Sequence, residues 1–96
     1  MELFIFARFH ASEGQEDAVA AAIREVVPLS HAEPGCLAIG AYRSARDPRL
    51  HWIHSRWRDE AAFELHATLS HTVRFIERVR DLIDNPLEVD RSYPIA

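Results

Sequence analysis

The feature that most limits the fold of this chain is an N-terminal segment that is apolar on both sides. Residues 2–10 are rich in aromatic and branched side chains and precede a polar turn that contains a glycine, which predicts a β-strand. One face of this strand carries Leu3, Ile5, Ala7 and Phe9. The other face carries Phe4 and Phe6, because successive side chains of a strand alternate. A single layer of helices covers only one sheet face, so a second subunit is the simplest cover for the other.

A helix is predicted over residues 15–30. Its apolar side chains recur at spacings of three and four, which places them on one stripe facing a core. Ser12 lies three residues before Gln15, the spacing of a capping box. Pro28 is expected to bend this helix without ending it. The sequence Glu33-Pro34-Gly35 then predicts its end, since the residue before a proline avoids helical dihedrals and glycine suits a turn.

The remainder of the chain predicts two strands, a broken helical segment and a last strand. Residues 36–43 and 50–57 form a hairpin, and Asp59 supplies the N-cap of a short helix through Leu69. A second helical segment restarts near Ser70 and ends before Pro86. With a strand over residues 87–93, the order is βαββαβ. We therefore expect one ferredoxin-like α+β domain over residues 1–96, with an antiparallel sheet and helices on one face.

Composition excludes several classes of function. The net charge of −4 and the absence of a basic run exclude the electrostatic footprint of a nucleic-acid binder. The apolar stretch of residues 3–7, like every other in the chain, is far shorter than the roughly 20 residues of a membrane-spanning helix. A single cysteine, Cys36, allows no intrachain disulfide, and the first residues lack the features of a signal peptide. The expected location is the cytoplasm.

Six histidines suggest a metal site, but their spacings do not support one. His66 and His71 would lie about 140° apart on a continuous helix, and His51 and His54 would point to opposite faces of a strand. No metal is expected, although ligands assembled from distant residues stay possible. The chain has only three glycines and no phosphate-binding loop, so no nucleotide cofactor is expected. Cys36 fits a buried small hydrophobe better than a nucleophile.

The stretch from Trp57 to His71 is the most informative part of the sequence. Here a strand ends in Trp and precedes a helix that carries Ala and His, a short polar break and a second His. With the Glu33-Pro34-Gly35-Cys36 turn, the Gly14 turn and the Asp47-Pro48 hairpin, the chain resembles the antibiotic-biosynthesis monooxygenase family. The resemblance implies subunits whose sheets pack together as a dimeric α+β barrel.

Two departures from related patterns limit what the resemblance carries over. The family commonly has Glu two residues before the Trp, where this chain has Ser55. A haem-degrading branch of the superfamily uses an Asn, a Trp and a His ligand at positions that correspond to Ala7, His66 and Ile76 here. The haem hypothesis therefore lacks its ligand.

The resemblance implies an oxygenase that needs no cofactor. A small phenol, quinol or anthrone is deprotonated, and its anion donates an electron to dioxygen. His66 is the preferred base or hydrogen-bond partner because imidazole titrates near neutral pH, and a capping or packing role is the alternative. Trp57 forms either an aromatic wall or plain core. Further candidates for substrate binding are His71, Tyr42 and His54, and also His10.

Two other functions remain open at this point. The same pocket and base could transfer a proton in an isomerase that acts on a small carbonyl metabolite, and oxygen dependence would separate this activity from an oxygenase. Alternatively, the chain is a dimeric domain that binds a small ligand without catalysis. Ligand-induced stabilisation without turnover would favour that function.

Overall fold

The computed structural model describes residues 1–96 and contains a four-stranded sheet with three helices. In chain order the elements are β1 (Leu3–His10), α1 (Glu16–His31), β2 (Cys36–Arg43), β3 (Leu50–Trp57), α2 (Glu60–Thr68), α3 (Ser70–Arg80) and β4 (Glu88–Ser92). The strands lie in the order β2-β3-β1-β4, and all neighbours are antiparallel. This arrangement confirms the predicted ferredoxin-like α+β fold.

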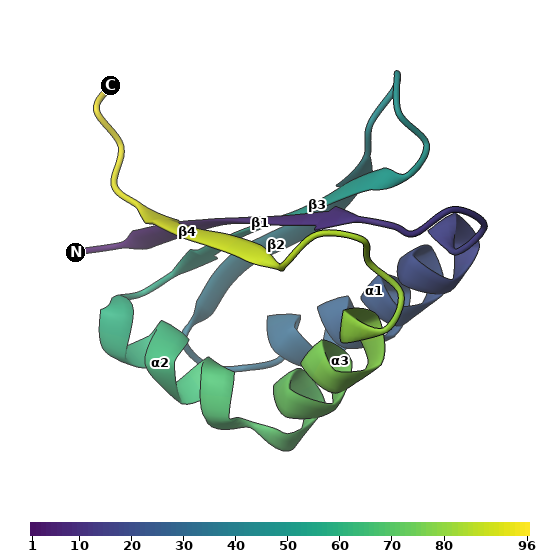
Figure 1. Cartoon of the computed structure of the whole chain (residues 1–96). Helices are drawn as coiled ribbons and strands as arrows, with labels where there is room; N and C mark the ends of the chain where they lie inside the picture. The colour runs from purple at the N-terminus through teal and green to yellow at the C-terminus, as the bar shows by residue number, and fades with distance from the viewer.

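All three helices lie on one face of the sheet, and the opposite face is uncovered (Figure 1). Strand β1 is central, and its alternation decides which side chains enter the core. Leu3, Ile5, Ala7 and Phe9 are buried on the helix side, whereas Phe6 on the other side is 39% exposed. The prediction of a strand with two apolar faces is confirmed.

Helix α1 runs through Pro28 to His31, so the proline does not end it. The predicted capping box at Ser12 is wrong, because Gln15 occupies the N-cap position and no side chain caps the helix. Instead, the backbone N–H of Ser12 donates to the carbonyl of Leu82 at 2.8 Å, which ties the turn after β1 to the segment that follows α3. Gly14 makes this turn with a φ of +83°, a conformation that favours glycine.

The second helical region is broken at Leu69, as predicted. Asp59 caps α2 by accepting a hydrogen bond from the N–H of Ala62 at 2.8 Å. Leu69 then has an extended ψ of 147° and serves as the boundary of both α2 and α3. The chain therefore changes direction between the two helices. None of the three helices combines the length and the apolar character needed to cross a membrane.

Candidate functional site

A cavity of about 280 Å³ lies between the sheet and the helices. Twelve of the sixteen residues that line it are hydrophobic, among them Phe9, Phe63 and Phe75. Its polar lining consists of Ser30, Ser55, His66 and Thr72. The volume lies slightly below the usual range for ligand pockets, about 300–1,000 Å³. A mostly apolar cavity of this size with few polar groups suits a small aromatic molecule.

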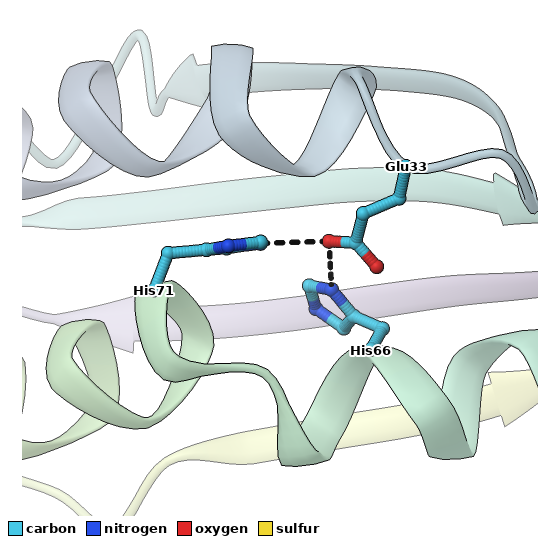
Figure 2. Close-up of side chains that lie close together, drawn as sticks. All are labelled: Glu33, His66 and His71. Carbon is cyan, nitrogen blue, oxygen red and sulfur yellow. Dashed lines mark hydrogen bonds and ion pairs between the residues drawn. The ribbon is translucent and has the colours of Figure 1, made fainter.

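Three side chains meet beside this cavity and form what we call the Glu33 cluster: Glu33, His66 and His71 (Figure 2). Glu33 Oε2 lies 2.8 Å from Nδ1 of His66 and 2.8 Å from Nε2 of His71. The three side chains are 10%, 15% and 18% exposed, in that order. Because an ionised carboxylate only accepts hydrogen bonds, each of these imidazole nitrogens is a donor.

The local sequence explains how Glu33 reaches α2. Glu33 begins the turn after α1, in which the N–H of Cys36 donates to the Glu33 carbonyl at 3.0 Å. Gly35 in this turn packs against α2 so closely that an added Cβ would lie 2.5 Å from Cβ of Ala62. Glycine at 35 therefore allows the close approach of the turn to α2, whose last turn carries His66.

The position of His71 differs from what its spacing predicts. On a continuous helix His66 and His71 would diverge, but both bind the same oxygen of Glu33. The extended residue Leu69 is the physical reason, because it redirects the chain so that the first turn of α3 faces the same point as the last turn of α2. The prediction that the two histidines lie apart is wrong, and the residues around Glu33 predict only a turn.

The hydrogen bond to Glu33 fixes the tautomer of His66. With the proton on Nδ1, the neutral imidazole carries its lone pair on Nε2. Nε2 has no hydrogen-bonding partner in the protein and is accessible to solvent. The ring lies on the cavity wall and is backed by Trp57, with ring centroids 4.5 Å apart. Thr72 Oγ1 lies 3.3 Å from Nδ1 of His66. His66 therefore presents an oriented basic nitrogen beside an apolar cavity.

Trp57 supports this site from within the core. Its side chain is 1% exposed and packs with Leu3, Ile5 and Ala62. Its Nε1–H donates to Ser55 Oγ at 2.9 Å. Ser55, which stands where the resembled family often has Glu, thus satisfies the buried indole and also lines the cavity. Trp57 is a core residue that holds the His66 ring in place.

Tyr42 and His54 lie on the uncovered face of the sheet, away from the cavity. Tyr42 is 57% exposed, and its ring centroid lies 5.2 Å from that of His54. Phe6 packs on His54 from β1 at 4.8 Å. His51, on the helix side of β3, is buried, as the alternation of the strand predicts. The structure of the chain does not bring Tyr42 or His54 to His66.

A second group of charged side chains, the His10 cluster, consists of His10, Asp47, Arg49 and Asp84. His10 Nδ1 lies 2.8 Å from Asp84, and Nε2 lies 3.0 Å from Asp47.

The two carboxylates shift the pKa of His10. Hydrogen bonding, mainly to Asp84 and also to Asp47, raises this pKa above 6.5. The Arg49 backbone N–H and His10 lower the pKa of Asp47, and His10 lowers the pKa of Asp84. Arg49 also binds Asp84 at 2.6 Å. Both nitrogens of His10 are occupied, so this cluster joins three chain segments rather than offering a base.

Cys36 is the first residue of β2, directly after the turn that contains Glu33, and is half-buried. Burial, with the nearby Glu33 carboxylate, raises the pKa of its thiol above 9.0. The thiol stays protonated at neutral pH and donates weakly to the Ala38 carbonyl at 3.6 Å. These observations support a structural role for Cys36.

Comparison with known proteins agrees with this architecture. The family model described as antibiotic biosynthesis monooxygenase matches residues 3–78. The solved structure of PA3566 from Pseudomonas aeruginosa is 32% identical, with a TM-score of 0.91 and coverage of 99% of this chain and 95% of that one. The structure of Rv0793 from Mycobacterium tuberculosis is 23% identical, with a TM-score of 0.94 over 100% of this chain and 97% of that one.

A curated relative from Synechocystis gives a match over part of its length. This uncharacterized protein is 30% identical over 67 residues, which are 70% of this chain. The matched region is 45% of the relative, so this chain spans about half the length of the curated protein that it matches.

Proposed function

Since the chain belongs to the antibiotic biosynthesis monooxygenase family, we propose that it oxidises a small phenol, quinol or anthrone-type substrate with dioxygen and without a bound cofactor. The observation that carries this proposal is the imidazole of His66, held by Glu33 at one nitrogen and free at the other, on the wall of an apolar cavity. This arrangement is what abstraction of a proton from a small aromatic hydroxyl or an activated C–H group requires.

The chemistry begins with transfer of the substrate proton to Nε2 of His66. The resulting imidazolium is stabilised by the Glu33 carboxylate at 2.8 Å. The substrate anion donates an electron to dioxygen, and a carbon–oxygen bond then forms. In the overall reaction, one oxygen atom becomes a new carbonyl oxygen, and the other leaves as water with two substrate hydrogens. The hydroxyl groups of Ser30, Ser55 and Thr72 line the same cavity and are available to donate to the substrate oxyanion.

The cavity environment suits an anion that must react with dioxygen rather than with water. Its lining is mainly hydrophobic, and a low local dielectric strengthens the few hydrogen bonds that reach the substrate. Because the volume is about 280 Å³, a compact substrate is expected. Trp57 and Glu33 act as positioning residues, since they orient the His66 ring from behind and from one edge.

The uncovered sheet face supports a homodimer as part of this proposal. Phe6 is 39% exposed and Tyr42 is 57% exposed, and both pack around His54 in the middle of that face. An exposed aromatic group on a sheet is covered most simply by the same face of a second copy. Light scattering at micromolar concentration should give twice the 11.0 kDa mass of the chain. A monomeric mass would contradict this part.

Proton transfer without oxygen is the second candidate function, because the same base beside the same cavity could isomerise a small carbonyl compound. A third candidate is a dimeric domain that binds a small ligand in the cavity without catalysis. The oxygenase and the isomerase are distinguished by their dependence on dioxygen. The binding domain would show ligand-induced thermal stabilisation without turnover.

Oxygen consumption by metal-stripped protein is the decisive measurement, against a panel of hydroquinones, naphthols and anthrones. Uptake should exceed the protein-free rate for at least one compound. Replacing His66 by Ala should lower this uptake about 10²–10⁴-fold, the usual contribution of a general base. His31→Ala, which changes an exposed histidine of α1, is the matched control. Uptake that is equal in the His66→Ala and control variants would contradict the assignment of the base.

A further inference from the structure

We propose that the Glu33 cluster binds one divalent transition-metal ion of the Zn²⁺ class, and that this ion switches off His66 as a base. The metal-binding part stands on the three side chains alone. The inhibitory part rests on the proposed function. The site draws its ligands from the turn after α1, from the end of α2 and from the start of α3 (Figure 2).

The donor set is one that such ions select. Two imidazole nitrogens and one carboxylate oxygen bind Zn²⁺ in sites that keep an open position, and the same set suits other first-row transition ions. Here the three donor atoms already lie within 4.8 Å of one another. The hydroxyl of Thr72 is a further oxygen near the site, 3.3 Å from Nδ1 of His66. A water molecule or this hydroxyl could complete a tetrahedron.

The distances require only small side-chain adjustments. In the structure Glu33 Oε2 lies 2.8 Å from each of the two nitrogens, with a proton between each pair. A tetrahedral ion with bonds of about 2.0–2.1 Å places its ligands roughly 3.3 Å apart. The oxygen and each nitrogen must therefore separate slightly. The two nitrogens, which lie at most 4.8 Å apart, must come within the same distance of roughly 3.3 Å. These changes are within the reach of side-chain torsions on elements that already converge.

The charge and the accessibility of the site also favour an ion. The Glu33 carboxylate is 10% exposed, and the two histidines are the partners with which it forms ion pairs; no arginine pairs with it. A buried carboxylate with no permanent cation is stabilised by a bound one. His71 also lines a groove of about 630 Å³ between α1 and α3, so the Glu33 cluster borders this groove as well as the cavity. The charged lining of the groove comprises Arg24, Glu25, Arg74 and Arg78.

Binding at Nδ1 changes the other nitrogen of His66. The ion replaces the proton that Nδ1 donates to Glu33, so the neutral ring must carry its proton on Nε2. The nitrogen that was the base is then an N–H donor. A metal ion at the Glu33 cluster and base catalysis by His66 therefore exclude each other, and the ion is expected to act as an inhibitor that leaves the cavity open.

Titration of untagged, metal-stripped protein with Co²⁺ tests the metal-binding part. One equivalent should saturate the visible ligand-field absorption of a tetrahedral ion, and Zn²⁺ should displace it. Glu33→Gln and His71→Ala each remove one ligand. Since loss of an outer-shell partner costs about 10–100-fold in metal affinity, these variants should lose at least about 100-fold. His31→Ala, with its exposed side chain, should bind like the wild type.

Two results would overturn the site: no saturable one-to-one binding by the wild type, or equal binding by the wild type and both ligand variants. X-ray absorption of the wild-type Zn²⁺ complex adds a test that needs no variant, because it should show two imidazoles and a carboxylate around the ion. Loss of oxygen uptake on adding one equivalent of Zn²⁺ is expected for the inhibitory part. Metal binding in a protein without turnover would instead contradict the proposed oxygenase and leave the site standing.

Discussion

The two histidine clusters of this fold use almost the same distances but leave different chemistry available. In the His10 cluster, Nδ1 and Nε2 of one imidazole contact two carboxylates at 2.8 and 3.0 Å. In the Glu33 cluster, one carboxylate oxygen contacts two imidazoles at 2.8 Å each. His10 thus has no free nitrogen, whereas His66 keeps one.

The difference shows that a histidine paired with a carboxylate does not by itself indicate a base. A ring bound at both nitrogens to carboxylates is held in its protonated form, which explains the raised pKa of His10. A ring bound at one nitrogen is oriented and still able to accept a proton at the other. The location agrees with this distinction, because His66 lines the cavity and His10 does not.

Among the changes that compare the two clusters, the largest expected effect comes from neutralising one carboxylate in each. Glu33→Gln should lower kcat by up to about 100-fold, the usual upper cost of an orienting partner, because the imidazolium of His66 loses its counter-charge. Asp84→Asn should leave kcat near the wild-type value and lower thermal stability instead. Steady-state oxygen uptake and thermal unfolding of both variants check the contrast. Equal losses of kcat would remove the functional distinction between the clusters.

Gly35→Ala tests whether close packing holds the Glu33 cluster together. The added methyl group would meet Cβ of Ala62 at 2.5 Å, so the turn and α2 must separate. Overpacking of this kind costs about 2 kcal/mol in the free energy of unfolding. The separation also lengthens the contact of Glu33 with His66, so turnover should fall together with stability. Urea unfolding measures the first effect, and unchanged stability would contradict the close approach.

Ser55→Ala should have a smaller effect, because Ser55 contacts Trp57, which in turn supports the ring of His66. The Nε1–H of the buried Trp57 would lose its partner at 2.9 Å, which costs about 1 kcal/mol in the free energy of unfolding. Ser55→Thr keeps a hydroxyl and serves as the matched control. Chemical denaturation of the two variants gives the comparison. A wild-type stability for Ser55→Ala would mean that water replaces the serine hydroxyl.

The pH dependence of the His10 cluster is expected to be the smallest effect. Because the folded pKa of His10 is raised above 6.5, its contribution to stability is complete below that pH and is lost as pH rises through the folded value. Asp47 and Asp84 have a pKa below 3.8, so their contribution is lost only as pH falls through their folded values. Stability from this cluster should therefore be greatest in mildly acidic solution.

Urea unfolding at several pH values between about 6 and 9 measures this dependence. The wild type should lose stability toward the alkaline end, and His10→Gln should flatten that slope. His51, whose pKa is lowered by burial, remains in both proteins and cancels in the difference. Identical slopes in the two proteins would contradict the role of His10.

Much of the fold could be predicted because its signals are local. The alternation in β1, the apolar stripe of α1, the Asp59 cap and the break near Leu69 all depend on neighbouring residues, and the structure confirms them. The Ser12 cap is wrong because the N–H of Gln15, which would bond the Ser12 side chain in a capping box, donates to the Ser12 carbonyl at 2.9 Å instead. The N–H of Ser12 is also used by the carbonyl of Leu82, about seventy residues away in the chain, and no local motif indicates that contact.

The sequence by itself determined the family, the βαββαβ order, the two apolar faces of the first strand and the choice of His66 as candidate base. Only the tertiary structure decided that Glu33 orients His66, that His71 shares the same oxygen, and that Tyr42 and His54 lie on the other sheet face. The physical reason is that helix and strand periods fix the direction of a side chain within its own element. The meeting of Glu33 with α2 and α3 depends instead on the extended ψ of Leu69 and on the close contact at Gly35.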